Sequence, residues 1–209
     1  GGNLSIIAMT NLELAEHASL LSQGGNVDLS ASLGTLTMAS GAMISSEISD
    51  GSLADAGDVR LQAGADLRLA SIRAGQASVS VMASGRIAQG LASGLASELN
   101  VHADALRISA GKGIGTEADG KVSTASSLRT QVMHLSARTP DADVGVANMG
   151  DLEVGPQEDL RMTRTTTTGL LAPVWDMAQS GLAAGSMGSV WVSTTGRMDI
   201  VSDPRLDGG

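Results

Sequence analysis

Short alternating triplets, in which a central residue separates two apolar ones, recur along the whole chain and constrain its fold more than any other feature. They come in pairs, with the second triplet following the first after a short interval. The first triplets begin at Leu4, Val27, Val59, Val79, Leu99, Val144 and Val190, and the second at Leu12, Leu36, Leu67, Leu106, Leu152 and Met198, with a weaker Ile87 after Val79. Alternation over so few residues is typical of strands that have one buried and one solvated face.

The spacing of the triplets predicts how the strands are arranged. Val59, Val79 and Leu99 are 20 residues apart, and Leu67, Ile87 and Leu106 nearly keep this step. Two or three short strands in about 20 residues cannot bury their own apolar face, so successive turns must stack. We therefore expect an all-β fold, a right-handed parallel β-helix (β-solenoid) of about 20 residues per turn, as a single segment over residues 1–209. A β-sandwich is disfavoured, because Asn-Gly hairpin dipeptides and long aromatic strands are missing.

The composition agrees with a narrow interior built from small and branched side chains. The chain has 27 Gly but no Phe, Tyr or Cys, and Ala63, Ala83, Ala103 and Ala110 fall at matching places after their triplets. Glycine supplies the backbone conformations that corners need, whereas large rings would fit badly inside. Without cysteine, disulfide frameworks and Cys-ligated metal sites are excluded.

The central positions of the triplets are mostly polar, and we expect them to form a solvated face. They are Asp28, Arg60, Arg68, Ser80, Asn100, Arg107, Glu153 and Asp199.

Three stretches break the period and are expected to form loops on the outside, near residues 45–57, 113–127 and 155–189. Within the longest, residues 170–180 are predicted to form a short helix or a hydrophobic plug. The candidate interaction loop consists of this insertion and its edge, with Thr165, Thr166, Thr167, Thr168, Trp175 and Trp191.

The sequence contains no convincing motif for phosphate binding, metal binding or catalysis. Residues 115–122 resemble a phosphate-binding loop, but Glu117 and Asp119 would oppose a phosphate, and a strand-like run follows where a helix is needed. The three histidines have no metal-ligand spacing, and the acidic pairs lie in Gly/Ala/Ser-rich loops without the calcium-binding nonapeptide. We predict no catalytic, cofactor-binding or metal-binding residues.

Charge limits the expected partners. With 13 Lys+Arg against 22 Asp+Glu, the net charge of −9 repels nucleic acids and anionic membrane surfaces. No run of apolar residues is long enough to span a bilayer, and we expect no signal peptide at residues 1–3, which have neither an initiator Met nor a basic region followed by an apolar run. Both ends look like turn boundaries, so we expect further turns of a longer polypeptide beyond them.

Three stretches, residues 57–87, 105–116 and 135–154, resemble the repeat units of large bacterial exoproteins related to filamentous haemagglutinin. This resemblance implies a right-handed parallel β-helix that is exported across the Gram-negative envelope and acts as adhesin, stalk or matrix component. The long segment 155–189 departs from the pattern.

The leading hypothesis is a structural and adhesive segment of a secreted or cell-surface exoprotein, associated with the outer membrane and without enzymatic activity. Its expected partners are neighbouring repeats of the same chain, host or bacterial surface glycans or proteins, or further copies of itself. Two alternatives stay open. One is a carbohydrate-active β-helix enzyme that uses a loop carboxylate pair such as Asp141 and Asp143. The other is a filament subunit whose ends stack head to tail.

Overall fold

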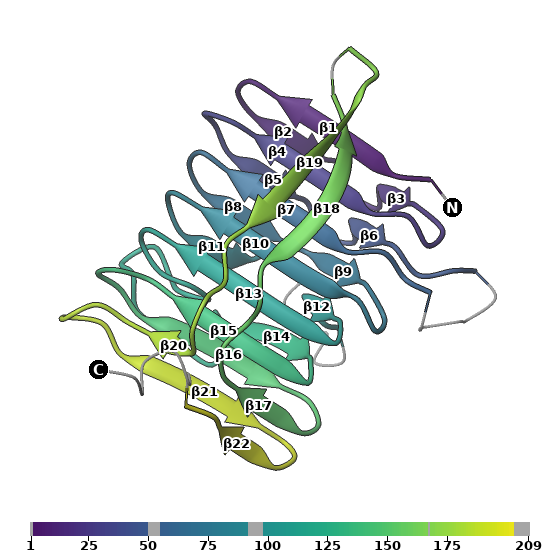
Figure 1. Ribbon diagram of the computed structural model, residues 1–209. Coiled ribbons are helices and arrows are strands. Elements are labelled where there is room, and N and C mark those ends of the chain that lie inside the picture. Colours follow the sequence, from purple (N-terminus) through teal and green to yellow (C-terminus); the bar gives the residue numbers. More distant parts are fainter. Residues whose placement is uncertain (1, 50–54, 92–97, 167, 203–209) are drawn as a thin grey trace.

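The computed structural model describes residues 2–49, 55–91, 98–166 and 168–202, and these form strands, turns and bends without a helix. Nearly all of the strands run parallel to their neighbours in stacked sheets (Figure 1). The one exception is an antiparallel pair, β18 (Leu160–Thr165) and β19 (Leu171–Asp176), which crosses the front of the stack in this view. The chain is thus an all-β structure of mostly parallel sheets.

From Leu4 to His102 the chain visits three sheets in rotation, and we call each passage from one strand of the first sheet to the next a circuit. The first sheet contains β1 (Leu4–Ala8), β4 (Val27–Ala31), β7 (Val59–Ala63), β10 (Ser78–Ala83), β13 (Ala105–Ala110), β15 (His134–Arg138), β17 (Leu152–Val154) and β22 (Met198–Ile200), with β20 (Leu182–Ala183) paired to β15. The second contains β2 (Leu12–Leu14), β5 (Leu36–Met38), β8 (Leu67–Leu69) and β11 (Ile87–Gln89). The third contains β3 (Ser19–Leu21), β6 (Met43–Ser45), β9 (Ser71–Arg73), β12 (Val101–His102), β14 (Leu128–Gln131), β16 (Val144–Asn148) and β21 (Val190–Thr194). The second sheet ends at β11, so the strands of later circuits lie in the first and third sheets.

The predicted register holds for the early circuits and fails after β11. Val59 and Val79 pair in register, 20 residues apart, as the spacing predicts. The residue that continues this row is Leu106, whereas Val101 lies in the third sheet beside Ile72. The prediction that Leu99 begins the next first strand is therefore wrong. Extra residues between β11 and β12 delay the return to the first sheet. The predicted constant period of about 20 residues is also wrong, because the paired residues Leu4, Val27, Val59, Val79 and Leu106 are 23, 32, 20 and 27 positions apart.

The same displacement exchanges the two sets of triplets in the later circuits. The triplets beginning at Val144 and Val190, predicted to match Val59, lie in β16 and β21 of the third sheet. Those beginning at Leu106, Leu152 and Met198, predicted to be second strands, lie in the first sheet. Alternation alone cannot distinguish these sheets, because all of them present apolar residues inward at the same period of two.

The core is a set of apolar rows that run along the stack between the three sheets. In the third circuit, Val59 and Leu61 come from the first sheet, Leu67 and Leu69 from the second, and Ile72 from the third, and all five are buried. The predicted row of small residues is present for Ala63, Ala83 and Ala110, which pair in register. Ala103 lies outside this row, because it follows β12 of the third sheet. Each circuit covers the apolar residues of the one before it.

Polar side chains at the corners bond the backbone of the next circuit. Asn3 Oδ1 accepts a hydrogen bond from Asn26 N, Asn26 Oδ1 accepts one from Asp58 N, and Asp58 Oδ1 accepts one from Ser78 N. Asn100 acts similarly beside the third sheet, where its side chain donates to Leu69 O and accepts from Arg129 N. The corners thereby satisfy backbone groups that the strands leave unpaired.

Glycines precede the corner residues Asn26 and Asp58 because successive circuits approach each other there too closely for a side chain. A Cβ atom on Gly57 would lie 2.3 Å from Gly25 O, and one on Gly25 would lie 2.2 Å from Gly2 O. Both obstructing atoms belong to the backbone, which cannot move without separating the successive circuits.

We therefore expect Gly57→Ala to lower the free energy of unfolding by roughly 1–3 kcal/mol, the range for inserting a carbon into a packed site. Gly2→Ala is the matched control, since a Cβ there meets nothing within 4 Å. Chemical denaturation of both variants measures the difference, and equal stability for the two would contradict the close-approach argument.

The remaining insertions leave the sheets at different places. Within residues 113–127, Ile114 bridges Ile87 and Val144 inside the stack, and the chain then continues into a loop closed by a bridge between Thr116 and Val122. Of residues 45–57, the segment 50–54 lies outside the described residues.

Candidate functional site: a hairpin across the first sheet

The insertion after β17 is a hairpin that folds back along the outer surface of the first sheet. The chain leaves the sheet at Gly155 and returns at Gly181, whose N–H donates to Gly155 O at 3.2 Å. We call residues 156–180, which contain β18 and β19, the strap. It extends from the level of β17 back to β1, where Thr165 N donates to Ser5 Oγ at 3.0 Å (Figure 1). An insertion of this kind interrupts one strand without disturbing the stack.

The strap lies on a single row of outward-facing polar residues in the first sheet. Parallel pairing places one residue from each of six strands in this polar row, which consists of Ser5, Asp28, Arg60, Ser80, Arg107 and Ser136. Every member bonds to the strap or to Gly181 at its end. From β1 to β15 the outer surface of the sheet is therefore, along this row, an interface rather than a solvated face.

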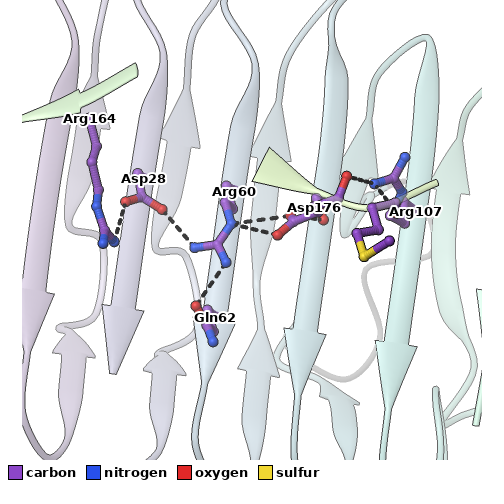
Figure 2. A network of polar contacts seen from close by, with 8 residues as sticks. Asp28, Arg60, Gln62, Arg107, Arg164 and Asp176 are labelled. Atoms are coloured by element: carbon purple, nitrogen blue, oxygen red, sulfur yellow. Dashed lines mark hydrogen bonds and ion pairs between the residues drawn. The ribbon is translucent and has the colours of Figure 1, made fainter. Parts of the chain in front are cut away.

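Charges of alternating sign meet at the centre of this interface between sheet and strap (Figure 2). Arg164 of the strap lies with Nη1 3.4 Å from Asp28 Oδ2, and Asp28 Oδ1 lies 3.1 Å from Arg60 Nη1. Arg60 Nε donates to Asp176 Oδ1 at 2.9 Å, and Ser80 Oγ donates to the other oxygen of Asp176 at 2.6 Å. The sheet and the strap thus each supply one arginine and one aspartate, and both aspartates form an ion pair across the interface.

Arg107 continues the interface toward the base of the strap. Its Nη1 donates to the backbone oxygens of Asp176 and Met177, at 2.8 and 2.9 Å. Burial lowers the pKa of Arg107, and the nearby carboxylate of Asp176 opposes that shift. Farther along, Gln179 Nε2 donates to Ile108 O at 3.0 Å, and Ser136 Oγ donates to Gly181 O at 3.1 Å.

The prediction of a solvated face is wrong for most of the positions that carried it. Asp28 and Ser80 are no more than 1% exposed, and Arg60 and Arg107 are also buried, because the strap covers them. Asn100 is buried at its corner instead. Arg68 and Glu153 are exposed as predicted, and Asp199 is half-buried.

The predicted helix or plug over residues 170–180 is also wrong. This stretch contains β19, which pairs with β18 from Leu160 opposite Asp176 to Thr165 opposite Leu171. It lies outside the core, and Trp175 is 61% exposed. Alternation decides this outcome, because the strap buries Leu160, Met162 and Asp176 against the sheet and leaves the intervening side chains outward.

The residues of the predicted interaction loop do not gather at one place. Thr165 and Trp175 lie at opposite ends of the paired strands of the strap, with Thr166 and Thr168 in the connecting turn. Thr167 lies outside the described residues. Trp191 belongs to β21 of the third sheet, where it pairs with Gly145, so it is separate from the hairpin.

The outward surface of the strap has an apolar and a polar edge. Leu171, Pro173 and Trp175 of β19 are exposed, and opposite them in β18 stand Thr165, Thr163 and Arg161. Asp159 pairs with Arg161 at 3.2 Å, and the N–H of Ala178 together with this guanidinium lowers the pKa of Asp159.

Pro173 has a further effect on the free edge of β19. Thr163 O accepts from Asn3 Nδ2, so this residue directs its backbone groups away from β19. Opposite residues of an antiparallel pair are either bonded to each other or both turned away from each other, so Pro173 faces the outer edge of the strap, where it has no N–H to offer. Its position discourages the addition of another strand there.

The histidines lie in three separate places, each beside one carboxylate. His17 is near Glu16, His102 Nδ1 is 3.2 Å from Glu47 Oε1, and His134 Nδ1 is 3.4 Å from Asp104 Oδ2. His134 lines a hollow of about 250 Å³ under the base of the strap, together with Asp104, Arg107 and Asp159. Ser80 also lines it, but its hydroxyl is committed to Asp176.

Three members of the acidic pairs considered for catalysis accept hydrogen bonds from their own surroundings. Asp143 is buried, and its carboxylate accepts hydrogen bonds from Ser189 N at 2.8 Å and Val122 N at 3.2 Å. Asp119 accepts one from Lys121 N within its own loop, and Glu117 accepts one from Ser123 Oγ. Asp50 lies outside the described residues.

Comparison of the chain with protein-family models, curated proteins and solved structures finds no match. Across the described ranges, no three His, Cys, Asp or Glu side chains come together as a metal-binding group. The same residues contain no helix long and apolar enough to cross a membrane. We therefore take the strap, with the hydrogen bonds and ion pairs that join it to the polar row, as the candidate functional site.

Sequence patterning did not identify this arrangement. Asp28, Arg60 and Arg107 occupy the outward positions of regular triplets, where polar residues are ordinarily solvated. One signal in the sequence was available. Asp28 and Arg60 carry opposite charges at equivalent triplet positions, and the longest insertion contains one residue of each sign, Arg164 and Asp176.

The buried carboxylate of Asp143 predicts a dependence of stability on pH. The hydrogen bond from Ser189 lowers its pKa, helped by Val122 and Lys121 and opposed by burial. A folded-state pKa below the unfolded value of about 3.9 means that this stabilisation is present above about pH 4 and is lost as the pH falls through the folded value.

We expect Asp143→Asn to be less stable than the unmodified chain by about 1–3 kcal/mol near pH 7, the scale of hydrogen bonds to a charged group. The difference in the free energy of unfolding between the two proteins should become smaller below about pH 4, as the carboxylate of the unmodified chain becomes protonated. Asp141→Asn, at an exposed neighbour, is the control. Urea unfolding between pH 2.5 and 7 measures the effect, and a gap that widens in acid would refute the assignment.

Proposed function

We propose that this chain is a right-handed parallel β-helix segment of a large secreted or cell-surface exoprotein of a Gram-negative bacterium, similar to filamentous haemagglutinin. It acts there as a stalk, without catalysis, and presents the strap as an adhesive surface. The observation that carries this proposal is the in-register parallel pairing of one sheet from β1 to β22 (Figure 1).

Stacking of this kind supports a spacer role because every added circuit lengthens the structure without changing its cross-section. Val27, Val59, Val79, Leu106 and Leu135 occupy equivalent inward positions of five successive strands. Each circuit needs only its neighbour to bury its apolar face, so length is set by the number of circuits.

The outward surface of the strap supports an adhesive role. A monomeric protein rarely exposes several large apolar side chains together without a partner. Leu171, Trp175 and Met177 are all more than 60% exposed, on a hairpin that the polar row anchors. Aromatic side chains supply most of the binding energy at many interfaces, which makes Trp175 the central residue of the surface.

The adhesive role predicts that labelled chain binds to epithelial cells or to Gram-negative bacteria, and that Trp175→Ala weakens this binding by about tenfold or more. Trp191→Ala is the matched control, because Trp191 lies in the third sheet and not on the strap. Binding isotherms by flow cytometry measure both variants. Adhesion that is absent, or that falls equally in the two variants, would contradict the role of the strap.

A separate measurement addresses the stalk. Small-angle scattering of the purified chain is expected to give an elongated particle whose long axis follows the stack. A globular profile would contradict the stalk, and end-to-end growth with concentration would favour the filament alternative instead.

A further inference from the structure

We propose that the strap is a longitudinal clasp, which makes the circuits beneath it open together instead of one at a time. This role is independent of adhesion and of the identity of the longer protein. It follows from how the polar row connects strands that do not touch each other.

Stacked circuits without such a connection are joined only to their immediate neighbours. Their stability is then a sum of local terms, and circuits at an exposed end can open while the rest stays folded. Here β1 pairs with β4, and β4 with β7, but no strand pairing connects β1 directly to β15.

The strap supplies this missing connection. It is attached covalently at Gly155 and Gly181, where β17 and β20 pair with β15. At its far end Asn3 Nδ2 donates to Thr163 O at 3.1 Å, and Ser5 Oγ accepts from Thr165 N. One hairpin therefore joins the two ends of a row of six strands.

Between these two ends, ion pairs and hydrogen bonds fix the strap to individual strands of the sheet. The strap therefore cannot shift along the sheet, or stay bound while two of these strands separate. Asp176 binds Arg60 of β7 and Ser80 of β10 with the same carboxylate, so it holds two adjacent strands at once. Asp28 of β4 binds Arg60 on one side and Arg164 of the strap on the other. Separating β4 from β7 therefore also strains the bonds to the strap.

Burial makes these charges dependent on one another. Removing one partner of a buried ion pair leaves a charge that is neither solvated nor neutralised, which costs far more than loss of an exposed pair. With Asp28, Arg60 and Asp176 all buried, partial opening of the interface is unfavourable. The clasp is accordingly either closed along its length or released.

The decisive experiment is native-state hydrogen–deuterium exchange on the purified chain, resolved by peptide. In the unmodified chain, amides of β1, β4 and β13 are expected to share a common opening. In a variant that lacks residues 156–180, with Gly155 joined to Gly181 by a short Gly-Ser linker, β1 and β4 are expected to exchange on the order of a hundredfold faster than β13.

Point variants test the same inference if the deletion variant does not fold. Asp176→Asn retains the shape of the side chain but removes the charge that binds Arg60, so exchange in β1 and β4 is expected to rise by about tenfold or more. Arg164→Met is expected to act in the same direction. The control is Arg161→Met on the same strand, because Arg161 is exposed and faces away from the sheet.

Two results would overturn the proposal. In one, Asp176→Asn and Arg164→Met accelerate exchange only in the strap itself, which would make it a passive cover. In the other, β1 and β4 already exchange independently of β13 in the unmodified chain. Loss of adhesion in these variants bears on the proposed function alone, since exchange is measured without any partner.

Discussion

Register between successive parallel strands is the constraint on which the rest of this structure depends. Each backbone ladder places a residue directly beside its equivalent in the next circuit. Equivalent positions therefore share the same environment, buried or outward-facing, along the stack. Inward positions become apolar rows, such as the one through Val27, Val59 and Val79. Outward positions become rows as well, and one of these is the polar row under the strap.

The same constraint explains where the chain can change. Corners are tight because the circuits are close, which requires glycine at Gly25 and Gly57 and side-chain acceptors at Asn26 and Asp58. Additional residues can only leave outward, as they do at Gly155, and return to the same strand at Gly181. The longest insertion leaves from the first sheet and folds back along the outer face of that same sheet.

The strap uses this surface in a way that separates two kinds of polar residue. Corner residues bond neighbouring circuits, and each acts over the distance between two strands. Residues of the polar row bond to a segment that passes over all of them, so Asp28, Arg60 and Arg107 are all joined to the same hairpin. A stack of locally joined circuits thereby gains an element that spans it.

Comparison of sequence and structure shows why some features could be predicted and others not. The triplets and the corner glycines follow from local patterning, and the pairing of Val59 with Val79 follows from spacing, whereas the helix or plug expected over residues 170–180 is a strand. The sheet to which Leu106 or Val144 belongs does not, because a strand looks the same in any of the three sheets. The burial of Arg60 was not predictable either, since its cover comes from Asp176, 116 residues away.

The sequence by itself determined an all-β chain of short parallel strands with a narrow apolar interior. It could do so because alternation, glycine placement and the lack of rings act within a few residues of each other. Only the tertiary structure decided the later register, the course of the strap and the role of the outward charges. Those depend on which distant segments meet, and a charged residue at an outward position carries the same local signal whether water or a hairpin covers it.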